Sequence, residues 1–361
     1  MFGHKHYVPI LKGKRGEFNA LGSLKQKSGL TPLIELVPPS GDDMTREDRL
    51  ASSVKSIVQR WGCNDPLFID CLYLAGSADE LDEDATAATT APSAWVEEIY
   101  DELRDQGCRA IPVTGTSRSP SFQAGLKRVV AKDGRGLCIR LIPDDFDDDT
   151  QLHEALDALL DFFEIEHSEV DLLVDHRSVA GQAAGTVRNQ MKANLAVLPR
   201  ILAWRTLTVA AGAFPVGIGQ MIRGQWNSEK RSDWLAWEKL VAGSELPRKP
   251  SFSDYGMRHP DLPPDGVATL LVQLRYASTS EWMVWKGTDF IRNGNQEFFS
   301  ICADLVSQPF FSGPTFSHAD GQLDERAANA GSGGNPEMWN RLGINHHVEM
   351  VLHQIANHPS L

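Results

Sequence analysis

Short apolar runs alternate with helix-like stretches along most of the chain. Between the runs, Leu152, Leu156, Leu159 and Phe163 recur at spacings of three and four, which predicts a helix with one apolar face. Runs this short and apolar are typical of parallel strands that are buried on both faces. The runs lie at residues 7–11, 32–37, 67–70, 110–114, 137–142, 170–175 and 206–210.

Seven strand–helix units at this cadence fit two architectures. One is a closed (β/α)8, TIM-barrel-like α/β fold, and the alternative is an open doubly wound α/β sheet. The turn after the first run, residues 12–17, lacks the Gly-x-Gly-x-x-Gly pattern of a dinucleotide-binding sheet. We therefore favour the barrel. A chain of 361 residues suits one barrel with additions, so we expect a single barrel-type domain over residues 1–361.

The last third of the chain adds elements to this pattern. Residues 252–255 continue the cadence and are expected to form barrel strand eight, whereas 267–287 predict an added β-hairpin. Residues 295–306 and 346–353 predict closing helices. Two segments rich in small and polar residues, 79–93 and 321–336, predict flexible loops.

The amino-acid composition limits the partners and the cellular compartment that we expect. The formal net charge of −13 makes bulk binding to nucleic acid unfavourable, because phosphate binding needs clustered Lys and Arg. No stretch approaches the ~20 apolar residues that a membrane helix requires, so we expect no membrane contact. The five cysteines are odd in number and widely spaced, which predicts reduced core thiols in a cytoplasmic protein.

Candidate chemistry follows from the barrel, because sites in this fold form where the strands end. The acids proposed as catalytic are Glu35, Asp70, Asp175 and Asp254. The residues proposed to bind a ligand are Lys12, Lys14, Arg140, Tyr255, Arg275, Tyr276 and Lys286.

Three interpretations of this set stay open. The charges could form a closed ring of ion pairs with a structural role only. They could instead hold a phosphate or carboxylate while an acid acts as general base. Finally, Glu35, Asp70 and Asp175 could hold Mg²⁺ or Mn²⁺, which prefer oxygen ligands. The basic, glycine-containing turn at residues 12–16 adds to the anion interpretation.

Two further groups predict structure and not chemistry. His346 and His347 are adjacent on an expected helix, so their side chains diverge and are not expected to share a metal ion. Trp226, Trp234 and Trp237 are expected to pack in the core or in a lid, since Trp buries a large area.

Several segments together resemble the bacteriophage beta protein family, which occurs in phages and many bacterial genomes. The resemblance implies a role in conflict between phage and host, but it implies no reaction. The matching segments are residues 7–17, 31–35, 252–256, 275–276, 285–287, 316–320 and 346–347.

Three functions are compatible with these observations. The first is a barrel that binds or acts on a small anionic ligand, such as a nucleotide or phosphoester. The second is a non-catalytic protein-interaction or immunity module, whose acidic surface suits a basic protein partner. The third is a nucleic-acid-processing enzyme. No Walker A, Gly-x-Ser-x-Gly or His-Glu-x-x-His motif decides between them, and oligomeric state is not indicated.

Overall fold

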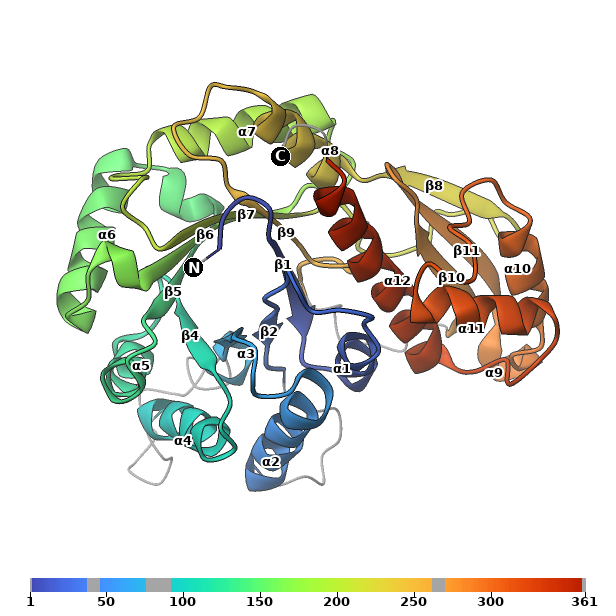
Figure 1. The fold of residues 1–361 in the computed structure, drawn as a ribbon, viewed down its shortest axis with the longest axis horizontal. Helices are drawn as coiled ribbons and strands as arrows, with labels where there is room; N and C mark the ends of the chain where they lie inside the picture. The colour runs from blue at the N-terminus through green and yellow to red at the C-terminus, as the bar shows by residue number, and fades with distance from the viewer. Residues whose placement is uncertain (1, 38–45, 76–91, 262–269, 359–361) are drawn as a thin grey trace.

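The computed structural model describes residues 2–37, 46–75, 92–261 and 270–358, and its centre is a closed barrel of eight parallel strands (Figure 1). This architecture confirms the predicted (β/α)8 fold. Strand order follows the chain, and the eighth strand pairs with the first. The strands are β1 (Tyr7–Lys12), β2 (Leu33–Glu35), β3 (Leu67–Asp70), β4 (Ala110–Thr114), β5 (Leu137–Leu141), β6 (Val170–Ser178), β7 (Thr206–Gly212) and β9 (Ser251–Asp254).

Helices surround the barrel on its outside. The position of an eighth ring helix is taken by α12 (Pro336–Ala356), which comes from the end of the chain and lies between α1 and α8 in Figure 1. The helices between strands are α1 (Arg15–Gly22), α2 (Arg46–Ser56), α3 (Leu72–Ala75), α4 (Pro92–Asp105), α5 (Pro120–Asp133), α6 (Asp149–Phe163), α7 (Ala184–Ala196) and α8 (Ser232–Ala242).

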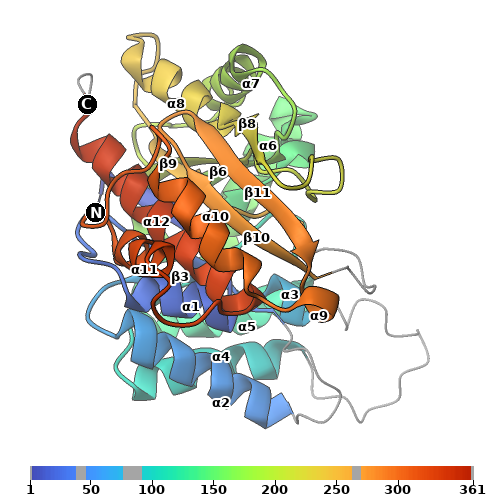
Figure 2. The same cartoon turned by 90° about the vertical axis from the view of Figure 1, so that its right-hand side faces the viewer.

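The predicted hairpin is present as β10 (Leu271–Ala277) and β11 (Glu281–Asp289), and residues 267–269 of the prediction lie outside the described residues. A strand that the sequence did not reveal, β8 (Trp226–Lys230), pairs with β11 to make a three-stranded antiparallel sheet. Helices from the C-terminal part pack beside this sheet (Figure 2). They are α9 (Phe290–Asn293), α10 (Glu297–Val306) and α11 (His318–Ala327), together with α12.

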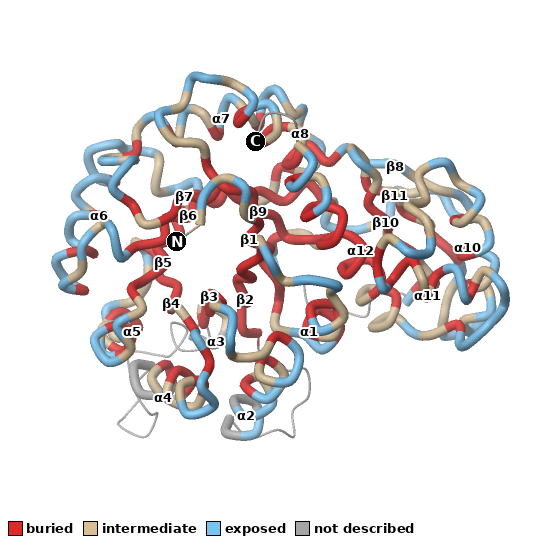
Figure 3. The backbone as a smooth tube through the Cα atoms, viewed as in Figure 1, coloured by how far each residue is buried: buried red, intermediate tan, exposed pale blue. Residues whose placement is uncertain are grey.

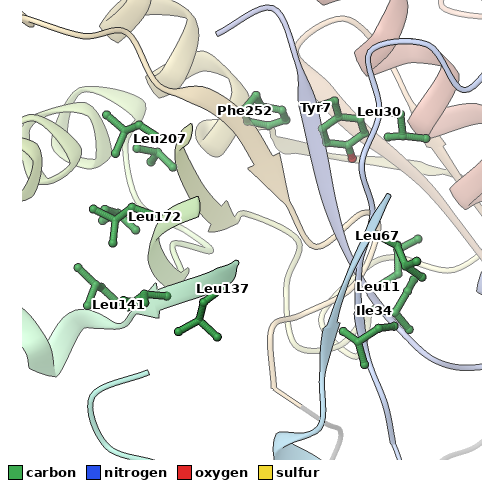
Figure 4. Packing of buried hydrophobic residues seen from close by; sticks show 14 of the residues in the cluster. Tyr7, Leu11, Leu30, Ile34, Leu67, Leu137, Leu141, Leu172, Leu207 and Phe252 are labelled. Carbon is green, nitrogen blue, oxygen red and sulfur yellow. The ribbon is translucent and has the colours of Figure 1, made fainter. Parts of the chain in front are cut away.

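The barrel strands are buried on both faces (Figure 3). Side chains such as Leu172 and Leu207 stand on the strands and pack toward the helices (Figure 4). The alternate positions, including Val8, Phe68 and Leu173, fill the barrel interior. This alternation with a period of two residues decides which polar side chains enter the barrel.

One cysteine expectation is wrong. Cys63 and Cys108 form a disulfide, whereas the other three cysteines are free and buried. Their separation of 45 residues gave no signal in the sequence. The pair forms because Cys63 precedes β3 and Cys108 precedes β4, and these two strands are neighbours in the barrel.

The predicted flexible loop over 321–336 is wrong over residues 321–327, which belong to α11. Ser317 caps this helix, and Leu323 is buried on its inner face. The residues that follow are tied down as well, because the Trp339 indole donates to the Gly333 carbonyl over 2.9 Å. The predicted loop at 79–93 lies outside the described residues up to 91, and α4 begins at Pro92.

The tryptophan expectation holds for Trp234 and Trp237, which are buried against the barrel strand residue Phe252. Within the described ranges, no helix combines the length and apolar character needed to cross a bilayer.

Candidate functional site

The inward-facing side chains at the carboxyl ends of five barrel strands are charged and buried. Strand register places Lys12 beside Glu35, and Glu35 beside Asp70. Arg140 and Asp175 come from β5 and β6 at the same end of the barrel. All five side chains are at most 4% exposed. The sequence prediction therefore located a real cluster of charges inside the barrel.

Arg140 lies at the centre of this cluster. Its Nη1 donates to Glu35 over 2.8 Å and to Asp70 over 3.0 Å. Its Nη2 donates to Asp175 over 2.7 Å and to the Tyr255 hydroxyl over 2.6 Å. Burial alone would lower the pKa of Arg140, but the surrounding oxygen groups outweigh it and raise that pKa well above its ordinary value. The guanidinium is therefore a permanent cation among three carboxylates.

Each of the three carboxylates also faces a second cation. Lys12 donates to Glu35, and Arg118 donates to both oxygens of Asp70 over 3.0 and 3.1 Å. A third pair is looser. Arg177 Nη1 lies 3.9 Å from Asp175, while its Nη2 pairs with Asp261 at 2.6 Å.

Asp70 and Asp175 are thereby held in the charged form. Burial would raise the pKa of Asp70, but Arg118 and Arg140 lower it below its ordinary value. Asp175 behaves in the same way, with Arg140 and Arg177 as the lowering charges. A general base works best with a pKa near the operating pH, so these acids are poorly suited to that role.

The three carboxylates proposed to bind Mg²⁺ or Mn²⁺ instead contact a positively charged side chain. The guanidinium of Arg140 lies between the carboxylates of Glu35, Asp70 and Asp175. Among the residues that the structure describes, no group of three or more His, Cys, Asp or Glu side chains is arranged to hold a metal ion. For these five strand-end charges, the ion-pair ring is the interpretation that matches the contacts.

Asp254 does not join this cluster. It points out of the barrel, where it accepts hydrogen bonds from Tyr7 over 2.6 Å and from His347 of α12 over 2.8 Å. The following residue, Tyr255, points inward and contacts Arg140. Asp254 therefore connects the barrel to α12, and its assignment as an acid of the mouth does not fit its contacts.

Two further predicted residues also lie away from the mouth. The Tyr276 hydroxyl donates to Asp320 over 2.7 Å, and its ring stacks on His346 at 3.7 Å. Lys286 donates to the carbonyls of Gly219 and Met221. Neither residue contacts the Arg140 cluster, because both belong to the added sheet.

A cavity of about 130 Å³ opens beside the cluster. It brings together the predicted Lys12, Lys14 and Arg275 with residues from the loops after β7 and β9. Four of its residues are Lys or Arg and one is a carboxylate. It is lined by Lys12, Lys14, Phe214, Pro215, Val216, Arg258, His259, Asp261 and Arg275.

Three of the charged groups in this cavity already have partners. Lys12 pairs with Glu35, and Asp261 pairs with Arg177. The third, Arg258, lies 2.6 Å from a carboxylate oxygen of Glu17, which is buried.

Lys14 and Arg275 have no carboxylate within ion-pair distance among the described residues. Burial and the nearby Arg258 lower the pKa of each below its ordinary value, and Glu17 offsets this only in part at Lys14. Such crowding of like charges is relieved when an anion binds. Arg275 is also held in place, because it donates to the Met257 carbonyl over 2.7 Å and stacks over the Phe214 ring at 4.7 Å.

The sequence reasoning missed four basic residues of the mouth: Arg118, Arg177, Arg258 and His259. Arg118, Arg258 and His259 lie in loops a few residues after β4 and β9, and the prediction considered only the strand ends. Arg177 lies within β6, which continues to Ser178, beyond the strand end predicted at residue 175. Arg177 also has a positive φ of 53°, which is uncommon for a residue other than glycine and typical of functional or constrained positions.

The chain matches one protein family. A family model described as "Beta protein" matches residues 7–353. No curated protein matches the chain.

Solved structures resemble the chain only weakly. Tryptophan synthase from M. tuberculosis is 10% identical over 69% of this chain and 83% of its own, with a TM-score of 0.35. Triosephosphate isomerase from Bartonella henselae is also 10% identical, over 69% of this chain and 92% of its own, with a TM-score of 0.34. We draw no conclusion about activity from either likeness.

Proposed function

This chain belongs to the Beta protein family, and we propose that it binds a small anionic ligand at the carboxyl-terminal mouth of its barrel. The observation that supports this proposal is the cavity in which Lys14 and Arg275 form no ion pair with a described carboxylate, since Asp261 pairs with Arg177 and Glu17 pairs with Arg258. Charge-assisted hydrogen bonds from Lys and Arg are strong and suit phosphate and carboxylate. The ion-pair ring beneath the cavity would serve as its rigid floor.

The size of the cavity limits what it can enclose. A cavity of about 130 Å³ is close to the ~150 Å³ engineered cavity that accepts benzene. A phosphate or carboxylate group fits such a space, but a whole nucleotide does not. The remainder of a nucleotide or phosphoester would pass along Pro215 and Val216, and Val216 is 70% exposed.

The same geometry favours binding over catalysis. Asp70 and Asp175 are held ionised by paired cations. His259 is the remaining acid–base group in the cavity besides Asp261. Its Nε2 is hydrogen-bonded to Ser178 over 2.9 Å, and its pKa is lowered by burial. A ligand-sensing barrel therefore agrees better with these contacts than a hydrolase does.

The test is calorimetric titration with inorganic phosphate and with a nucleoside monophosphate. Lys14→Gln and Arg275→Gln should each weaken binding by about tenfold, as expected for one charge-assisted contact. Lys55→Gln is the matched control, because Lys55 is exposed on α2 and carries the same charge away from the cavity. Equal affinity in all three variants, or no binding by the native chain, would contradict the proposal.

We further propose that this binding acts in conflict between phage and host, which the family resemblance supports. Expression in a bacterial host should change the plating efficiency of at least one phage. Lys14→Gln should abolish that change, whereas Lys55→Gln should keep it. If Lys14→Gln and the native chain act alike, the mouth is not the working site.

A further inference from the structure

We propose a second ligand site, for a small aromatic carboxylate, at the opposite, amino-terminal mouth of the barrel. A cavity of about 310 Å³ opens there, more than twice the volume of the cavity beside Lys14. Ligand pockets commonly start at about 300 Å³, so this cavity can enclose a whole small molecule. It shares no lining residue with the carboxyl-terminal cavity, so the two proposals stand independently.

The floor of this cavity is apolar and aromatic. Phe68 is 2% exposed and belongs to the packing of the barrel interior. Phe2 meets the Phe68 ring edge-on at 6.5 Å and stacks on His6 at 4.0 Å. In the view of Figure 1, the segment that leads into β1 lies over the ring of strands. The N-terminal segment thus supplies an aromatic wall against which a flat ring can pack.

The rim of the cavity is cationic. Arg205 forms a two-point ion pair with Asp171, at 3.1 and 2.6 Å, so these charges cancel. Arg109 and Arg135 also line the cavity. Neither has a carboxylate within ion-pair distance in the part of the chain that the structure describes. Two positive charges are therefore left over at this mouth.

The guanidinium groups of Arg109 and Arg135 are hydrogen-bonded to backbone carbonyls, which do not neutralise their charge. Arg109 Nη1 donates to the Asn64 carbonyl over 3.3 Å, and Arg135 Nη1 donates to the Cys108 carbonyl over 2.6 Å. Each guanidinium keeps further N–H groups for a ligand. The planar fork of a guanidinium matches the two oxygens of a carboxylate.

The aromatic floor and the cationic rim together indicate which class of ligand fits the cavity. Inorganic anions would leave the aromatic floor unused, and a neutral aromatic compound would leave two cations unpaired. A ring that carries a carboxylate satisfies both parts. Salicylate is a suitable probe, with acetate and benzyl alcohol as compounds that carry only one of its two features.

The experiment is calorimetric titration of the native chain with each probe. Salicylate should bind the amino-terminal mouth with a stoichiometry of one, and more tightly there than acetate or benzyl alcohol. The double variant Arg109→Gln/Arg135→Gln should weaken salicylate binding by at least about tenfold. Phe2→Ala should weaken it as well while leaving the rim charges in place.

Controls separate this site from the carboxyl-terminal cavity. Arg128→Gln removes an exposed arginine that pairs with Glu97 on the helix ring, and it should leave salicylate binding unchanged. Any salicylate bound in the carboxyl-terminal cavity should be lost in Lys14→Gln, whereas salicylate binding at the amino-terminal mouth should persist in that variant. Equal salicylate affinity in the double variant and the native chain, or equal affinity for salicylate and benzyl alcohol, would overturn the inference. Absence of saturable salicylate binding would do the same.

Discussion

Replacing Arg140 by Met tests whether the ion-pair ring is structural. The change removes the cation shared by Glu35, Asp70 and Asp175 while keeping an unbranched aliphatic stem at this position. Removing one partner of a buried ion pair commonly costs about 3–5 kcal/mol, because the remaining charge stays buried. Whole domains are stable by about 5–15 kcal/mol, so a large share of the stability should disappear.

The stability deficit of the Arg140→Met variant should also depend on pH, in a direction that follows from the carboxylate pKa values. In the native chain the pKa values of Asp70 and Asp175 are lowered, so their stabilising effect is present above the ordinary carboxylate pKa of about 4 and is lost as pH falls through the lowered values. Without Arg140, burial should raise those pKa values. The folded variant should then take up protons on acidification, and its deficit relative to the native chain should be smaller near pH 5 than near pH 7.

Urea unfolding, followed by the fluorescence of the nine tryptophans, measures this difference. Arg128→Met serves as the control, because its pair with Glu97 is exposed and should contribute little to stability. An Arg140→Met variant that unfolds within about 1 kcal/mol of the native chain at pH 7 would refute the structural role. If that variant also lost anion binding, Arg140 would instead be a ligand-contacting group.

The remaining predictions concern backbone and thiols. Gly136→Ala should destabilise the fold by more than about 1 kcal/mol, because φ is +75° and the added Cβ would lie 2.0 Å from the Glu169 carbonyl oxygen. Gly185→Ala, in α7 with open space around it, should be neutral or stabilise by up to about 1 kcal/mol, and thermal unfolding of the two variants compares them. Thiol titration of the denatured chain should count three reactive cysteines before reduction and five after it, and five before reduction would contradict the Cys63–Cys108 bond.

The barrel itself could be predicted because its signal is local. Each buried parallel strand is a short apolar run, and each helix that follows has one apolar stripe, so the cadence is visible without knowledge of contacts. The eighth strand, Ser251–Asp254, was found in the same way. By contrast, β8 has little apolar character, since Glu229 and Lys230 are exposed, and it forms only because β11 lies beside it.

The sequence predicted which residues gather at the candidate site better than it predicted what each of them does there. The sequence indicated Lys12, Glu35, Asp70, Arg140 and Asp175 as the polar ends of apolar strands, and the structure brings these five together. Their pairing could not be predicted, because it joins positions up to 105 residues apart that meet only when the barrel closes. The ion pairs that a carboxylate makes determine whether it can act as a general base, a metal ligand or only a counter-ion.

By itself, the sequence determined the repeating strand–helix units, the apolar stripes and the charges at the strand ends, because these depend on residues close together in the chain. The tertiary structure decided which way each side chain faces. Strands buried on both faces carry no contrast between inside and outside, so the neighbours Asp254 and Tyr255 looked equivalent. Closure of the barrel sends Tyr255 inward to Arg140 and Asp254 outward to α12. Loop packing then leaves Lys14 and Arg275 without an ion pair among the described residues.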